Sequence, residues 1–93
     1  MDVRYYIDPE TDEPHIYRHR LTEQDVEAVL RRPIEDRPGR DGARVALGRT
    51  PAGSYLRVIY VPDPIPNSVF VITAYRLGPK ALKALRRRRR RKR

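Results

Sequence analysis

Three stretches in the second half of the chain are rich in apolar, β-prone residues, the last of them most of all, and successive side chains of such a strand alternate between two faces. Residues 43–49, 54–61 and 68–77 are rich in Val, Ile, Leu and Tyr. This pattern predicts three β-strands. The segments that separate them, residues 50–53 and 62–67, carry Gly and Pro and are predicted turns. Consecutive strands joined in this way form a meander.

The alternation also assigns side chains to the two faces of the predicted sheet. In the middle strand Leu56, Val58 and Tyr60 share one face. In the last strand the set expected in the core is Phe70, Ile72 and Ala74. The open face would then carry a group of polar and aromatic side chains, namely Tyr55, Arg57, Thr73 and Tyr75.

A helical period is clearest after Thr22. Val26, Val29 and Leu30 recur at helical spacing, Thr22 is a suitable N-cap, and Pro33 ends the helix.

The remaining segments are predicted from shorter signals. Residues 3–7 read as a short strand, residues 15–21 as one or two helical turns, and residues 33–42 as a polar loop. Pro79 suits the first turn of another helix, which continues through residues 80–85 into an arginine block.

The order of these elements is strand, helix, meander and helix. It predicts a single α+β domain over residues 1–79, with a small antiparallel sheet made of the N-terminal strand and the meander. The helices are expected on one face of that sheet. Residues 80–93 are expected to form a basic helix that runs into a disordered tail of Arg and Lys.

Charge divides the chain at the same place. The whole chain has 21 Lys and Arg against 12 Asp and Glu, a net charge of +9. Ten of the cations and no acid lie in residues 80–93, so residues 1–79 hold 11 cations and 12 acids, a net charge of −1. A neutral domain with a cationic appendage indicates a polyanionic partner.

Other classes of protein are excluded or disfavoured by composition. The chain has no Cys, which excludes disulfides, thiolate metal sites and a cysteine nucleophile. Two histidines alone, His15 and His19, do not complete a zinc site. No apolar run reaches the roughly 18–20 residues that span a bilayer, and no lipidation motif or signal peptide is apparent. We therefore expect a cytoplasmic protein without metal, cofactor or membrane attachment.

Three groups of short motifs resemble a known family. They are Ile7-Asp8-Pro9-Glu10, then Arg18-His19-Arg20-Leu21-Thr22, and finally Gly48-Arg49-Thr50 with the strands around Arg57 and Ile72-Thr73-Ala74-Tyr75. Together they resemble the BrnT family of small bacterial toxins over most of residues 5–77. The chain is also similar to a group of uncharacterised small domains related to BrnT that have an Ile-Thr-Ala-Tyr ending. It departs from BrnT at Arg20, where the family has Gly, and at Tyr75, where the family has Arg.

The resemblance implies a RelE-like fold, a metal-independent endoribonuclease activity and an antitoxin partner. Such cleavage needs a base, an acid and cations beside the phosphate, and His, Tyr and Arg provide them. The resemblance and the assignment of faces select six candidate catalytic residues: His19, Arg49, Arg57, Thr73, Tyr75 and Arg76. His15, four residues before His19, would assist it. RNA, in isolation or on the ribosome, is the expected substrate.

The basic appendage is the candidate nucleic-acid-binding segment. Its cations are Lys80, Lys83, Arg86, Arg87, Arg88, Arg89, Arg90, Arg91, Lys92 and Arg93. It would anchor RNA through phosphates, without reading sequence. Two other uses stay open: docking of an acidic antitoxin, and contact with the acids at residues 10–13 or 35–36 of the chain itself. The alternative to a toxin is a non-catalytic nucleic-acid-binding or protein-interaction module on the same fold.

Overall fold

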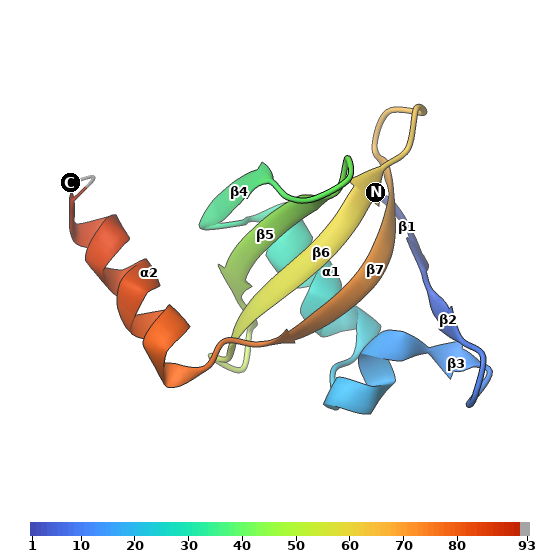
Figure 1. Cartoon of the computed structure of the whole chain (residues 1–93), viewed down its shortest axis with the longest axis horizontal. Coiled ribbons are helices and arrows are strands. Elements are labelled where there is room, and N and C mark those ends of the chain that lie inside the picture. The colour runs from blue at the N-terminus through green and yellow to red at the C-terminus, as the bar shows by residue number, and fades with distance from the viewer. Residues whose placement is uncertain (92–93) are drawn as a thin grey trace.

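The computed structural model describes residues 1–91 as a mixed sheet with helices on both sides (Figure 1). The helical elements are η1 (His15–His19), α1 (Glu23–Arg31) and α2 (Pro79–Arg91). The strands are β1 (Asp2–Tyr5), β2 (Ile7–Asp8), β3 (Glu13–Pro14), β4 (Glu35–Pro38), β5 (Arg44–Arg49), β6 (Tyr55–Pro62) and β7 (Ser68–Arg76). The predicted α+β class is confirmed.

The main sheet has five strands in the order β1-β7-β6-β5-β4. The predicted meander is confirmed, because β5, β6 and β7 pair in antiparallel succession. The prediction of a wholly antiparallel sheet is wrong, since β1 pairs with β7 in parallel. The chain between these two strands includes α1 and the other three strands of the main sheet, so no hairpin forces β1 and β7 to run in opposite directions.

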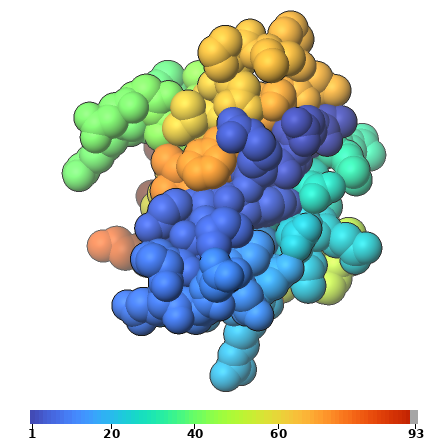
Figure 2. All heavy atoms as spheres, turned by 90° about the vertical axis from the view of Figure 1, so that its right-hand side faces the viewer, coloured from blue at the N-terminus to red at the C-terminus, as the bar shows by residue number. Residues whose placement is uncertain are grey.

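The first strand was predicted as one segment and is interrupted. β1 ends at Tyr5, and the chain then enters a two-stranded ribbon in which β2 pairs with β3. The Tyr6 N–H donates to the Val71 carbonyl at 2.8 Å, which continues the contact with β7 beyond β1. Figure 2 shows the N-terminal residues, in blue, lying over this side of the molecule beside β7, in orange.

β4 lies within residues 33–42, which were predicted to be a loop, so that prediction is wrong. The strand pairs with β5 and forms the outer edge of the sheet, where Pro38 can be accommodated. The Tyr60 hydroxyl donates to Asp36 Oδ2 at 2.6 Å and ties this edge to β6. Burial, together with that bond, raises the pKa of Tyr60 to about 12.

Helix α1 begins as predicted. Thr22 Oγ1 accepts the Asp25 N–H at 3.1 Å, and Asp25 Oδ2 accepts the Thr22 N–H at 3.0 Å, so the two residues form a capping box. Val26 and Val29 are fully buried. The helix therefore covers one face of the sheet with its apolar side.

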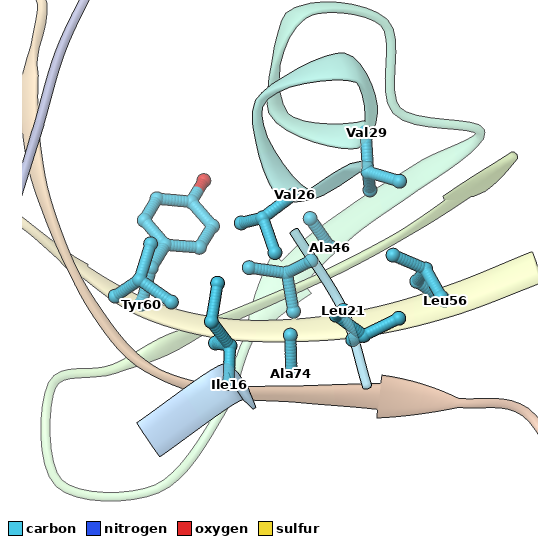
Figure 3. Packing of buried hydrophobic residues seen from close by; sticks show 10 residues of the cluster. Ile16, Leu21, Val26, Val29, Ala46, Leu56, Tyr60 and Ala74 are labelled. Atoms are coloured by element: carbon cyan, nitrogen blue, oxygen red, sulfur yellow. The ribbon is translucent and has the colours of Figure 1, made fainter. Parts of the chain in front are cut away.

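The main core lies between that face and the segments α1 and η1 (Figure 3). Leu56, Val58 and Tyr60 of β6 are buried in it, as predicted. In β7 the buried residues are Val71 and Ala74, and Ile72 is 36% exposed. The prediction of Ile72 as a core residue is wrong because the register between β6 and β7 shifts at Ile59/Tyr60, and the irregularity reverses the alternation of β7.

Helix α2 approaches the opposite face, so the prediction that all helices share one face is wrong. Gly48 faces α1, since an added Cβ there would lie 2.9 Å from Val29 Cγ1. Its neighbour Leu47 therefore points to the opposite face, together with its cross-strand partner Glu35. Arg88 of α2 binds Glu35 with two bonds of 2.7 and 2.9 Å, and Leu85 is fully buried.

The basic helix is longer than residues 80–85. It extends to Arg91 and contains most of the arginine block, while Lys92 and Arg93 of the expected tail lie outside the described residues. Its less exposed side carries Ala81, Leu82, Leu85 and Arg88, which are spaced as one face of a helix. The docked side is thus mainly apolar, and the cations gather on the outer side.

Candidate functional site

Arg57 and Tyr75 form the centre of a polar cluster on the face of the sheet opposite the main core. We call this surface the open face. The two residues are direct cross-strand partners in β6 and β7. Arg57 Nη1 donates to the Tyr75 hydroxyl at 3.5 Å, and Arg57 Cζ lies 5.9 Å from the centre of the Tyr75 ring. A guanidinium group therefore adjoins a phenol hydroxyl.

His19 joins this pair because η1 packs against the end of β7. The centre of the His19 ring lies 6.0 Å from that of Tyr75, and the His15 ring lies 5.5 Å from His19. The Tyr6 ring follows at 6.2 Å from His15. We call these five residues, Tyr6, His15, His19, Arg57 and Tyr75, the ring cluster. It brings together three of the six candidate catalytic residues.

Arg76 supports this arrangement from the other side of β7. Its Nη1 donates to the His19 carbonyl at 2.9 Å, at the carbonyl end of η1. A cation is favourable there because the last carbonyls of a helix carry partial negative charge. Arg20, at the C-cap, has a φ of 58°, which turns the chain away from η1. Arg76 therefore holds His19 in place, and its guanidinium binds a backbone oxygen.

Asp8 is the buried partner of His15. Its side chain is only 6% exposed, with Oδ2 3.3 Å from His15 Nδ1 and in contact with Arg18 Nε. Oδ1 accepts the backbone N–H of Glu10 at 2.9 Å. That bond, followed by those with His15 and Arg18, lowers the pKa of Asp8 below its ordinary value. When the Asp8 carboxylate accepts a hydrogen bond from Nδ1–H, Nε2 of His15 is left available on the other side of the ring.

Asp8 predicts a dependence of stability on acid. Because its pKa is lower in the folded protein, Asp8 stabilises the fold fully above pH 3.8 and loses this contribution as the pH falls further. We expect Asp8→Asn to lower the melting temperature at pH 7 and to lose less further stability between pH 5 and pH 2.5 than the wild type does. Thermal unfolding followed by circular dichroism measures this. Equal acid sensitivity in both proteins would contradict it.

A hollow of about 580 Å³ opens beside Arg57 and Tyr75. Its floor is aliphatic and its rim is polar, formed by the turn between β4 and β5 on one side and the ring cluster on the other. The lining residues are Gly39, Arg40, Asp41, Ala43, Val45, Arg57, Ile59, Val61, Ile72 and Tyr75.

In the part of the chain that the structure describes, Arg49 and Thr73, the two remaining candidate catalytic residues, have no ring contact with the ring cluster. Arg49 lies over the ring of Tyr55, at 5.9 Å, and Arg86 of α2 lies 5.8 Å from the same ring. Thr73 pairs with Ile59 on the open face. Arg49 and Arg86 therefore form a second cationic group around Tyr55, two residues before Arg57 on β6.

The candidate nucleic-acid-binding segment presents its cations on one ordered surface. Seven of these cations are exposed: Lys80, Lys83, Arg86, Arg87, Arg89, Arg90 and Arg91. Arg88 forms an ion pair with Glu35. Lys92 and Arg93 lie outside the described residues. The cations of α2 therefore point outward over most of its length, with Arg86 reaching the Tyr55 group.

Sequence reasoning missed Tyr6, which belongs to the ring cluster, Asp8, which binds His15 of that cluster, and Asp41, which lines the hollow. In the sequence Asp8 stands out only as part of the Ile7-Asp8-Pro9-Glu10 motif, and no local pattern connects it to His15. Asp41 did carry a signal, because Asp-Gly is the dipeptide typical of a hairpin turn.

The class defined by these features is a small α+β domain with a ring cluster on an open sheet face. Residues 15–76 match the family described as a domain of unknown function, DUF4258, and the chain belongs to this family. The matched segment contains η1 through β7, and with it His15, His19, Arg57 and Tyr75. No curated protein and no solved structure matches the chain.

Two further observations concern residues 1–91. None of the helices there is long and apolar enough to cross a membrane. Within the same residues, no three His, Asp or Glu side chains come together as ligands for a metal ion.

Proposed function

We propose that this domain is an RNA-binding, metal-independent endoribonuclease, similar in fold and activity to the BrnT and RelE toxins. The observation that carries the proposal is the grouping of His19, Tyr75 and Arg57 on the open face. These three side chains come from separate elements and supply the base, acid and cation that cleavage of a phosphodiester requires.

In the proposed reaction His19 takes the proton of a ribose 2′-hydroxyl, whose oxygen attacks the adjacent phosphorus. The bond from phosphorus to the 5′-oxygen breaks, and the Tyr75 hydroxyl donates its proton to that leaving oxygen. Arg57 binds the non-bridging oxygens, where negative charge develops. The products are a 2′,3′-cyclic phosphate and a 5′-hydroxyl, and exchange with water returns a proton to Tyr75 and removes one from His19.

The neighbouring contacts prepare these groups for their roles. Arg76 fixes the backbone of His19, and Asp8 orients His15, whose ring packs against His19. Arg57 also lies beside the Tyr75 hydroxyl, to which its Nη1 donates, so the cation and the proposed acid are held together. Holding reacting groups in place before substrate arrives is a major part of enzymatic rate enhancement.

The cationic side of α2 would anchor RNA through its phosphates. We expect Arg87→Gln/Arg90→Gln to weaken RNA binding and to make the dependence of log Kd on log salt shallower by roughly 1.4, because each phosphate contact to a single strand contributes about 0.7. Fluorescence anisotropy at several salt concentrations measures the slope. Arg31→Gln/Arg32→Gln, at the end of α1, removes the same charge and should leave the slope unchanged. Equal slopes in the two double variants would contradict this role of α2.

The biological setting we propose is a cytoplasmic toxin with a cognate antitoxin. Induction of the wild-type chain in bacteria should stop growth, and the His19→Ala/Tyr75→Phe variant at equal expression should allow it. Co-expression of the adjacent gene product should restore growth if that product is the antitoxin. If bacteria that express the unmodified chain grow as fast as uninduced bacteria, the toxin assignment is contradicted.

The second candidate function is a non-catalytic RNA-binding module. The observation that favours it is the succession of rings from Tyr6 through His15 and His19 to Tyr75, since unpaired bases stack on such side chains without chemistry. In that case the unmodified chain would bind RNA with an affinity that falls as salt rises, and it would leave the RNA intact. Binding without cleavage therefore selects this candidate over the first.

A further inference from the structure

The hollow beside Arg57 owes its shape to the turn between β4 and β5. Asp41 and Gly42 have φ values of 53° and 80°, as hairpin turns of the primed types require, and the Ala43 N–H donates to the Arg40 carbonyl at 2.9 Å. A Cβ at Gly39 would lie 3.0 Å from Val45 Cγ2, which shows that the chain passes close over the open face here. The turn thereby forms one wall of the hollow.

The lining combines an aliphatic floor with polar groups of opposite charge. Val45, Ile59 and Ile72 are apolar, while Asp41 and Arg57 offer an acceptor and a donor. Arg57 Nε is buried and has no hydrogen-bond partner, the one such side-chain atom found in residues 1–91. A buried donor without a partner is costly, so a ligand that accepts from Arg57 would gain from this site.

We infer that the hollow binds one unpaired nucleobase of the RNA and that it selects guanine. This inference rests on the proposed function, because it supplies the specificity of the same site. Guanine presents two acceptors, O6 and N7, which suit an arginine, and the five N–H donors of Arg57 allow it to donate to the base as well as to the phosphate. Its N1–H and N2–H groups form a pair of donors for a carboxylate, which adenine, cytosine and uracil do not offer in that combination.

The position of the hollow connects recognition with cleavage. Arg57 and Tyr75 line the hollow and also belong to the ring cluster. A base seated on the aliphatic floor can stack on Tyr75, and the phosphate next to that base then lies toward His19. The cations of α2 bind the strand without reading its sequence, so the hollow supplies the only base selection in this proposal.

The test uses 2′-O-methyl tetranucleotides, which cannot be cleaved because the attacking hydroxyl is blocked. Four labelled probes carry a single G, A, C or U in the same uridine background, and anisotropy gives their Kd values. The wild type should bind the G probe roughly 10-fold more tightly than the A probe, the size of discrimination a paired polar contact provides. Asp41→Asn, which tolerates the positive φ, should abolish most of that preference.

A second variant and a control isolate the hollow. Ile72→Trp fills the hollow from an exposed position and should reduce binding of the G probe to the level of the U probe. Arg87→Gln/Arg90→Gln should weaken all four probes equally. Equal Kd values for the four probes, or an unchanged G preference in both Asp41→Asn and Ile72→Trp, would overturn the inference.

These outcomes are independent of catalysis. A guanine preference in a protein that leaves unmodified RNA intact would contradict the nuclease proposal and support the base site. Cleavage of RNA without base preference would support the nuclease proposal and overturn the base site.

Discussion

His19→Ala is expected to lower the rate of RNA cleavage by about 100- to 10 000-fold, the range that a general base contributes. Tyr75→Phe should cause a loss in the same range, because it removes the hydroxyl that protonates the leaving oxygen and keeps the ring. Single-turnover cleavage of a short labelled RNA measures both rates. The Kd for an uncleavable probe should change little in comparison, since His19 and the Tyr75 hydroxyl act mainly in the transition state.

The matched control for Tyr75→Phe is Tyr17→Phe. Tyr17 is 41% exposed and its hydroxyl donates to Glu23, away from the ring cluster. This variant should cleave RNA at the wild-type rate. The double variant His19→Ala/Tyr75→Phe should be less impaired than the product of the single losses, because residues that act in one step are not additive. If His19→Ala and Tyr75→Phe each cleave RNA at the wild-type rate, His19 is not the base and Tyr75 is not the acid.

The second large effect is expected at Leu85, the fully buried residue of α2. Leu85→Ala should lower the free energy of unfolding by about 2–5 kcal/mol, because it removes buried methyl groups and leaves a cavity between helix and sheet. Urea denaturation followed by circular dichroism measures this. The loss is a large part of the 5–15 kcal/mol that stabilises a typical domain.

Lys83→Ala is the control on the same helix. Lys83 is exposed, so the change should alter stability by less than about 0.5 kcal/mol. Leu85→Ala should also weaken RNA binding, since an undocked helix no longer holds its cations beside the open face. If Leu85→Ala and Lys83→Ala unfold at the same urea concentration, α2 does not pack on the sheet as described.

The meander and helix α1 could be predicted because their signals are local. Alternation in β6 places Leu56 and Val58 in the core, and the cap at Thr22 marks the first turn of α1. The register shift opposite Ile59 and Tyr60 is different, because it depends on how β6 and β7 fit together and moves Ile72 to the open face. The alternation of side chains along β7 alone does not reveal the position of this register shift.

Strand β4 was missed because its residues are charged and include Pro38, a composition typical of loops. An edge strand is nevertheless the place where charge and proline are tolerated, since one side of it has no partner. The Asp41-Gly42 pair was the available signal, as it predicts a hairpin between flanking segments. The parallel pairing of β1 had no such signal, because it joins residues more than sixty positions apart.

The candidate site was partly predictable. Arg57 and Tyr75 were placed on one face by strand alternation, and they are direct partners in the structure. His19 came from the family resemblance, and its approach to Tyr75 depends on the packing of η1 against β7, which no short pattern encodes. The division of charge was visible in the sequence, whereas the docking of α2 through Leu85 and Arg88 required the three-dimensional structure.

Cleavage of a chemically defined RNA tests the central claim most directly. The purified wild-type chain is incubated in EDTA with a labelled 12-nucleotide RNA that has one ribonucleotide step and is otherwise 2′-O-methylated. We expect two fragments, one ending in a 2′,3′-cyclic phosphate and the other beginning with a 5′-hydroxyl, and no fragments with His19→Ala/Tyr75→Phe purified in the same way. Intact RNA with the wild type, or equal cleavage by the double variant, would contradict the account.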